Sequence, residues 1–223
     1  QLYFFLRVQD KQGVFLFKKV TPTRRRSPEI SINSKIRIKL DFPKAAFTMS
    51  DDEISHITIL LDHLKNDDHN QRLNSIRNLD TIGEALGVER TIEELLPYLT
   101  EIIEEGDDED EIYLAYAEML GNFVHRCGGI QSAHHLLPPL ENLCLVEEAN
   151  VREKAIESLS AIGNEFSADQ HEKYFIPMIK RLAGGDWYSA RISACGLVVI
   201  PYDKVNDTIQ QELKSTFKEL GED

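Results

Sequence analysis

Long apolar runs are missing from this sequence of 223 residues. A membrane-spanning helix needs about 18 or more consecutive apolar residues, and no stretch of the sequence approaches that length. Cysteine is also scarce, with three residues at positions 127, 144 and 195. Three thiols in a chain of this length do not build a disulfide framework, so they predict a protein of a reducing compartment. We therefore expect no membrane partner and a location in the cytoplasm, with the nucleus as a second location.

Residue patterns that bind a cofactor or carry out catalysis are equally rare. The glycine pairs Gly128-Gly129 and Gly184-Gly185 belong to no GxGxxG or Walker-type loop, so they indicate turns and no nucleotide site. The pair His134-His135 lacks further ligands at the spacing of a metal site. The acidic run from Asp107 to Glu111 lacks the alternating ligands of an EF-hand and is typical of a solvated loop. The sequence thus predicts no catalytic residue, no cofactor and no bound metal.

Basic residues are scarce over most of the chain. The formal net charge is −13, which argues against nucleic acid as a partner. The distribution is uneven, because residues 1–48 hold eleven Lys or Arg and three Asp or Glu, a net charge of +8. Residues 49–223 hold fourteen Lys or Arg and thirty-five Asp or Glu, a net charge of −21. The chain therefore consists of two unlike parts that meet near Met49.

The first part, residues 1–48, has too little apolar sequence for a core of its own. Side chains from Ile30 to Leu40 alternate between apolar and polar, which is typical of a strand. We therefore expect an irregular or weakly β extension. One interpretation is a basic tail for nuclear import or an Arg-rich transit peptide. The other, which we favour, is a disordered segment with no native role ahead of a translation start at Met49, so that a chain beginning there keeps the same thermal midpoint.

The second part is repetitive. An apolar segment around a proline recurs with spacings of 41 and 39 residues, at Pro97, Pro138 and Pro177. A second pattern starts from an anchor position that recurs with spacings of 41, 39 and 39 residues, at Arg72, Tyr113, Arg152 and Arg191. Small or apolar side chains follow each anchor at fixed distances, and an acidic residue lies five positions before it. Two independent patterns that keep one register over four units indicate a repeat protein.

Each unit predicts two helices joined by a short turn. Apolar residues from Ile92 to Ile103, and again from Val151 to Ile162, recur at the spacing of an amphipathic helix. One helix pair cannot bury an apolar stripe with two sides, whereas stacked pairs can. A period near forty with a proline in the first helix is typical of HEAT repeats. The expected fold is all-α, an α-α superhelix (HEAT-repeat solenoid) with units at 51–87, 88–128, 129–165 and 166–205 and the first helix of a fifth unit at 206–223.

Several stretches of the second part resemble one family within this repeat class. They are Gln71-Arg-Leu-Asn-Ser-Ile76, Ala85-Leu-Gly-Val-Glu-Arg90, Glu94-Leu-Leu-Pro97, His135-Leu-Leu-Pro-Pro-Leu140 and Lys180-Arg-Leu-Ala-Gly-Gly-Asp-Trp187. Residues 56–223 are similar to the N-terminal end of the scaffold (A) subunits of protein phosphatase 2A. That resemblance implies a non-catalytic scaffold of fifteen HEAT repeats, of which about the first third is present. It implies that regulatory B-type subunits bind a ridge of loops in the early repeats, while later repeats, which are absent here, hold the catalytic subunit.

The turns between paired helices are the expected partner-binding ridge. Acidic residues occupy equivalent positions in successive turns, and two aromatic residues follow the fourth: Asp67, Asp68, Asp108, Glu109, Glu147, Glu148, Asp186, Trp187 and Tyr188. Tryptophan is over-represented at interface hot spots. The simpler alternative is that acids at helix N-termini only complement the helix dipole, and that Trp187 packs against the next turn.

Two other functions are compatible with this amino-acid composition. A HEAT solenoid can carry cargo as a transport receptor, or serve as another protein-interaction adaptor. The chain can also be an enzyme with an unrecognised site, but no pairing of nucleophile and base supports that alternative. The stretches quoted above favour the phosphatase scaffold over the transport receptor.

Overall fold

The computed structural model of the chain describes residues 4–9, 15–20, 29–31, 37–39, 51–105 and 109–222. Helices make up the part from residue 51 onward. They are α1 (Asp51–His63), α2 (His69–Arg77), α3 (Leu79–Arg90), α4 (Leu96–Glu105), α5 (Asp110–Gly121), α6 (Leu137–Leu143), α7 (Ala149–Glu165), α8 (Ala168–Gln170), α9 (Ile176–Ala183), α10 (Tyr188–Leu197) and α11 (Asp207–Glu222).

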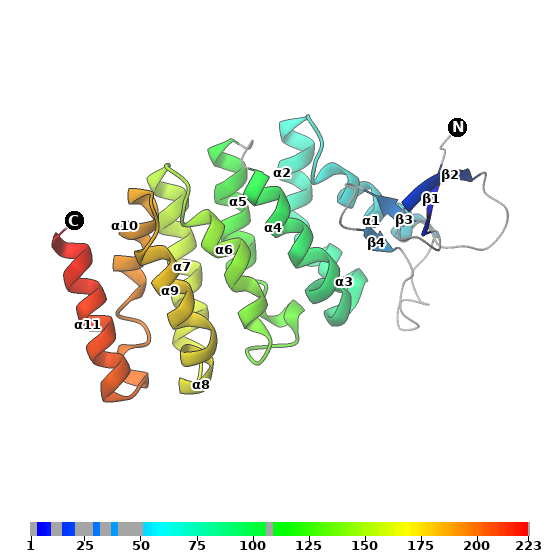
Figure 1. Cartoon of the computed structure of the whole chain (residues 1–223). Coiled ribbons are helices and arrows are strands. Elements are labelled where there is room, and N and C mark those ends of the chain that lie inside the picture. The colour runs from blue at the N-terminus through cyan, green and yellow to red at the C-terminus, as the bar shows by residue number, and fades with distance from the viewer. Residues whose placement is uncertain are drawn as a thin grey trace.

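The helices form two layers (Figure 1). Helices α4, α6, α9 and α11 lie side by side in one layer, and α2, α5, α7 and α10 lie side by side in the other. Apolar side chains between the layers make one continuous core, from Ile57 in α1 to Leu213 in α11. The predicted all-α solenoid is confirmed, because each helix pair buries its apolar stripe against the next pair.

The predicted unit boundaries stay a prediction, but the helix pairs fall within them. Helices α4 and α5 lie within 88–128, α6 and α7 within 129–165, and α9 and α10 within 166–205. The first boundary falls at Gly87, whose φ of 77° interrupts α3. Such a φ is readily adopted only by glycine, so the residue type explains where the helix bends.

The described residues of the N-terminal part form four short strands. The strands β1 (Phe4–Gln9) and β2 (Phe15–Val20) pair antiparallel, and so do β3 (Glu29–Ser31) and β4 (Arg37–Lys39). This agrees with the predicted weakly β extension. Whether residues 1–48 have a native role stays a prediction.

The repeated prolines mark places where a helix changes type. Pro97 and Pro177 are the second residues of α4 and α9, and each helix continues a π-helical segment, η2 (Thr91–Leu95) or η5 (His171–Phe175). Pro138 follows the 3₁₀ segment η4 (Ala133–Leu136) at the start of α6. Proline lacks the N–H that would bond to the carbonyl of residue i−4. The irregularity of each of these first helices therefore lies beside its proline.

The arginine anchors fasten the turns. The Arg72 guanidinium donates two hydrogen bonds, of 2.9 and 2.7 Å, to the carbonyl of Asn66. Arg152 donates to the carbonyls of Val146 and Glu147, and Arg191 in the same way to those of Gly185 and Asp186. These carbonyls lie beyond the ends of the first helices, where helical partners are missing. The anchor thus holds each turn against the helix that follows it.

Buried side-chain hydrogen bonds join neighbouring units of the solenoid. The hydroxyl of Ser158 in α7 donates to the carbonyl of Ala117 in α5 at 2.8 Å, and Ser193 in α10 donates to the carbonyl of Cys144 at 2.9 Å. Both hydroxyls are buried. Because buried polar groups need partners, these bonds fix how successive units stack.

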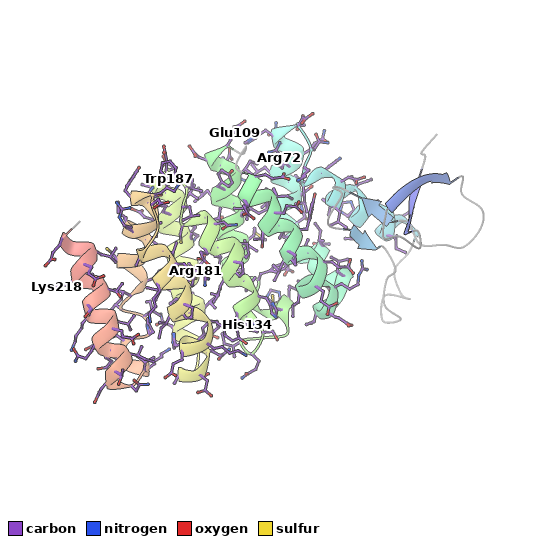
Figure 2. All side chains as sticks on the ribbon, viewed as in Figure 1. Arg72, Glu109, His134, Arg181, Trp187 and Lys218 are labelled. Carbon is purple, nitrogen blue, oxygen red and sulfur yellow. The ribbon has the colours of Figure 1, made fainter. Side chains whose placement is uncertain are left out.

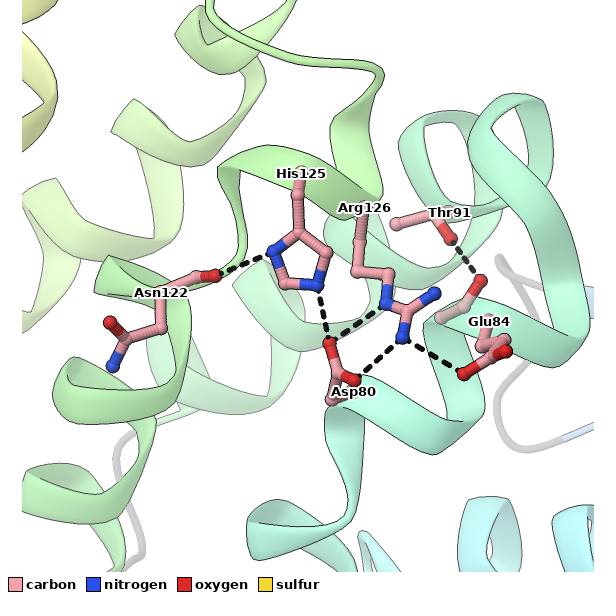
Figure 3. Close-up of polar contacts among 7 residues, drawn as sticks. Asp80, Glu84, Thr91, Asn122, His125 and Arg126 are labelled. Atoms are coloured by element: carbon pink, nitrogen blue, oxygen red, sulfur yellow. Dashed lines mark hydrogen bonds and ion pairs between the residues drawn. The ribbon is translucent and has the colours of Figure 1, made fainter.

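An ionic cluster on the edge opposite the turns joins α3 to the segment η3 (Val124–Cys127) (Figure 3). The Arg126 guanidinium donates to both carboxylate oxygens of Asp80, at 2.8 and 2.7 Å, and to Glu84 at 2.9 Å. His125 Nε2 lies 2.8 Å from Asp80. The hydrogen bond from Arg126 is the main cause that lowers the pKa of Asp80 to about 2. The cluster is structural, since all its charges pair with one another.

His171 should make the stability of the solenoid depend on pH. It is fully buried, with its ring 5.4 Å from that of Phe175 and 5.9 Å from that of Phe166. Burial, helped by the charge of Lys204, lowers the pKa of His171 from 6.5 to about 4. The unfolded chain therefore binds a proton near pH 6.5 that the folded chain binds only near pH 4. Above pH 6.5 the titration of His171 therefore does not lower the free energy of unfolding, and below pH 6.5 this free energy falls as the pH drops toward 4.

The measurement compares the chain with its His171→Phe variant, which keeps an aromatic ring between the two phenylalanines. Urea unfolding between pH 7.5 and 4.5 should show the original chain losing up to about 3 kcal/mol relative to the variant. Because all other groups titrate in both proteins, the difference isolates His171. Parallel pH profiles would show that His171 titrates normally in the folded chain.

Candidate partner-binding ridge

The described residues of the turns that join paired helices lie along one edge of the solenoid. Glu109, before α5, and Trp187, before α10, lie along the upper edge in Figure 2. We call this edge the acidic ridge; its described members are Asp67, Asp68, Glu109, Glu147, Glu148, Asp186, Trp187 and Tyr188. Asp108 lies outside the described residues. The predicted register thus places these side chains along one edge.

Three of the ridge acids have structural partners. Asp68 is the N-cap of α2 and accepts a 2.9 Å hydrogen bond from the backbone N–H of Gln71. Glu148 caps α7 by accepting from the N–H of Asn150. The Glu109 carboxylate lies 3.3 Å from Nδ1 of His69, in the preceding unit. Removing a cap typically destabilises a helix by about 1 kcal/mol. The simpler alternative to partner binding therefore explains part of the acidic pattern.

Three other ridge acids have no such role. Asp67, Glu147 and Asp186 are exposed, and within the described part of the chain their side chains make no hydrogen bond or ion pair. They occupy equivalent positions, each five residues before an arginine anchor. The anchor holds the backbone of its turn, so each of these exposed carboxylates extends from a fixed backbone position without being neutralised.

Two aromatic residues stand beside the last of these acids. Trp187 is 67% exposed and Tyr188 is 50% exposed. Trp187 is the N-cap residue of α10, yet its side chain makes no capping hydrogen bond. The expectation that Trp187 packs against the next turn does not account for so large an exposed surface. An exposed indole on a braced turn is instead suited to contact an apolar surface of another molecule.

A shallow hollow beside the fourth turn was not predicted from the sequence. It has a volume of about 370 Å³, and its lining includes Gly184 from that turn, Lys180 from α9, Arg191 from α10 and Leu220 from α11. Lys180 is paired with Glu212 at 2.7 Å. Residues from three helices converge here, which the pattern of a single unit cannot reveal. The fourth turn therefore offers acidic, aromatic and basic groups close together.

Other kinds of site find no support in the described residues. Among them, no group of three or more His, Cys, Asp or Glu side chains is arranged to hold a metal ion. No helix in the described part of the chain has the length and apolar character needed to cross a membrane.

Known proteins resemble the chain closely over most of its length. It is 51% identical over 175 residues to the alpha isoform of the 65 kDa regulatory (A) subunit of serine/threonine-protein phosphatase 2A from Arabidopsis thaliana, a match that covers 78% of the chain and 29% of that protein. It is 50% identical over 181 residues to the human beta isoform, covering 81% of the chain and 30% of the relative. It is 48% identical to the 65 kDa regulatory subunit of serine/threonine-protein phosphatase PP2A from Drosophila melanogaster, a match that covers 78% of the chain and 29% of that protein.

No protein-family model matches the chain. The chain spans about three tenths of the length of the curated relatives it matches. By this identity, the 65 kDa regulatory (A) subunits of protein phosphatase 2A are homologues of the chain over the residues matched.

Proposed function

We propose that the chain is a non-catalytic scaffold whose acidic ridge binds a regulatory B-type subunit of the phosphatase. The observation that carries the proposal is the set of unneutralised carboxylates at Asp67, Glu147 and Asp186, in register along one edge and next to Trp187 and Tyr188. The names of the relatives, which are regulatory subunits of a phosphatase, support a role without catalysis. The catalytic subunit is expected to bind repeats of the longer relatives that this chain does not include.

The ridge suits a partner with basic and apolar groups. Neighbouring stacked helices lie about 8–10 Å apart, so charges in successive turns act together within roughly one Debye length. Such a row of charges mainly raises the rate of association with a basic partner. The exposed aromatic pair then supplies apolar contact area after docking. Because Arg72, Arg152 and Arg191 hold the backbone of their turns in place, little ordering is needed when the partner binds.

Charge reversal of the unpaired acids tests the proposal. The variant Asp67→Lys, Glu147→Lys, Asp186→Lys should bind purified B-type subunits at least about tenfold more weakly at low salt, chiefly through slower association. Near 0.5 M salt the difference should shrink, because screening weakens the attraction. Asp68 and Glu148 are left unchanged, since reversing them would remove helix caps. Association rates are measured by surface plasmon resonance at several salt concentrations.

A matched control reverses three exposed acids on the opposite edge: Glu165, Asp169 and Asp203. Both variants change the net charge equally, and neither removes a hydrogen bond or ion pair of the described residues. If the two variants weaken binding to the same extent, overall charge and not the ridge attracts the partner. If neither affects binding while circular dichroism shows normal helicity, the proposed ridge is wrong.

The alternative function, a transport or other adaptor, predicts a different partner. A pulldown from lysate should recover phosphatase B-type subunits with the original chain and fewer with the ridge variant. Recovery of a small GTPase in their place would favour the transport receptor.

A further inference from the structure

Among the described residues, the basic N-terminal part of the chain contacts the helical part at strand β4. Strand β4 (Arg37–Lys39) lies against the π-helical segment η2 (Thr91–Leu95), which leads into α4. Strand β4 also pairs with β3, so it reaches η2 as part of a hairpin. Two segments that are more than fifty positions apart in the sequence are therefore neighbours.

The two neighbours carry opposite charge. In the sequence around β4, the basic residues Lys35, Arg37 and Lys39 alternate with Ile36 and Ile38. Residues 91–105, which form η2 and α4, contain five Glu and no Lys or Arg. The opposite charges thus belong to the two segments that contact each other, β4 and η2.

Some of these acids have no partner within the solenoid. Glu94 is bound by Arg90 through two hydrogen bonds of 2.9 Å, and Glu105 by Lys65. By contrast, Glu93 in η2 and Glu89 just before it are exposed, and among the described residues no hydrogen bond or ion pair involves their side chains. Val88, beside them, is 46% exposed. The surface at η2 thus offers unneutralised carboxylates next to an apolar side chain.

We propose that this surface is a docking site for the chain's own basic strand, so that β4 acts as an intramolecular ligand of η2. Two of the three residues of β4 are basic, which complements the unneutralised carboxylates of Glu89 and Glu93. Only eleven residues, 40–50, separate β4 from the start of α1. A linker this short keeps the ligand at a high effective concentration, of the order of millimolar, so weak contacts suffice for docking.

The proposal is independent of the ridge and departs from the expectation that residues 1–48 have no native role. If the extension docks, it shields the acidic surface of η2 from basic groups of other molecules. If it does not dock, it is an inert appendage.

Zero-length cross-linking of the full chain tests the contact directly. A carbodiimide activates a carboxylate, and a lysine amine in contact with it then forms an amide bond. Mass spectrometry should find Lys39 joined to Glu93 or Glu89, and the product should fall several-fold in 0.5 M salt. Lys18 and Lys19 of β2 are the internal control, since they belong to the same extension but to the other hairpin. Cross-links to residues 89–94 that are as abundant from Lys18 or Lys19 would contradict docking through β4.

Paired charge reversals give a second readout. In the full chain, Arg37→Glu with Lys39→Glu should speed hydrogen exchange in residues 91–95 by about threefold or more, since docking protects that segment. Lys18→Glu with Lys19→Glu changes the net charge equally and should leave the exchange unchanged. Equal rates in both variants and in the original chain would overturn the proposal and restore the expectation of a dispensable extension.

Discussion

Replacing Gly121 with valine should destabilise the solenoid by about 3 kcal/mol or more, because α5 and α7 touch at this residue. A Cβ atom on Gly121 would lie 2.3 Å from Oγ and 2.7 Å from Cβ of Ser158. The Ser158 hydroxyl is not free to turn away without loss, since it donates the buried bond to the Ala117 carbonyl. Valine would therefore push α7 from α5 and break a hydrogen bond between the units.

Urea unfolding measures the effect, and hydrogen exchange locates it. Exchange should rise on both sides of the contact, in α5 and in α7, because each unit of a solenoid is stabilised mainly by its neighbours. The control is Gly221→Ala near the end of α11, where a new Cβ meets no atom within 4 Å. Alanine there should be neutral or stabilise by up to about 1 kcal/mol through helix propensity. An unchanged unfolding midpoint for the valine variant would contradict the prediction, because it would mean that close contact between α5 and α7 at Gly121 does not contribute to stability.

The sequence alone was enough to predict the stacking of helix pairs. Side-chain periodicity decides which face of a helix is buried, and a constant spacing decides that successive pairs bury equivalent faces. The anchors at Arg72, Arg152 and Arg191 could be located for the same reason, since the register repeats. Their partners could not be predicted, because those are backbone carbonyls of the preceding turn. Every residue has a carbonyl, so the sequence pattern does not indicate which one accepts the hydrogen bond.

Contacts that occur between only one pair of units also could not be predicted from the sequence. Gly121 looks like an ordinary helix-end glycine until Ser158, in the next unit, is known to lie against it. In the same way the ridge positions followed from the repeat, but their different roles did not. Asp68 and Glu148 cap helices while Asp67 and Glu147, one residue earlier, do not, and that difference depends on backbone angles that neighbouring acids do not reveal. The contact of β4 with η2 belongs to no repeat, so periodicity could not indicate it.

Replacing Trp187 with alanine should weaken binding of a B-type subunit by about 30-fold, the effect of losing roughly 2 kcal/mol at a hot spot. The side chain is 67% exposed, so the fold loses little apolar contact when it is removed. The thermal midpoint should therefore stay within about 2 °C of the original. Binding is measured by calorimetry with purified B-type subunits, and the midpoint by circular dichroism.

Val199→Ala is the matched control, because Val199 follows α10 at its other end and is 66% exposed. If exposed apolar surface alone promoted binding, both variants would weaken it; if the ridge binds the partner, only the tryptophan variant should. The kinetics add a second distinction. Loss of the indole should act on the dissociation rate and depend little on salt, whereas reversal of Asp67, Glu147 and Asp186 should act on association at low salt. If the Trp187→Ala variant binds with unchanged affinity while the charge reversal still weakens binding, the ridge attracts the partner through its charges and Trp187 is not part of the interface.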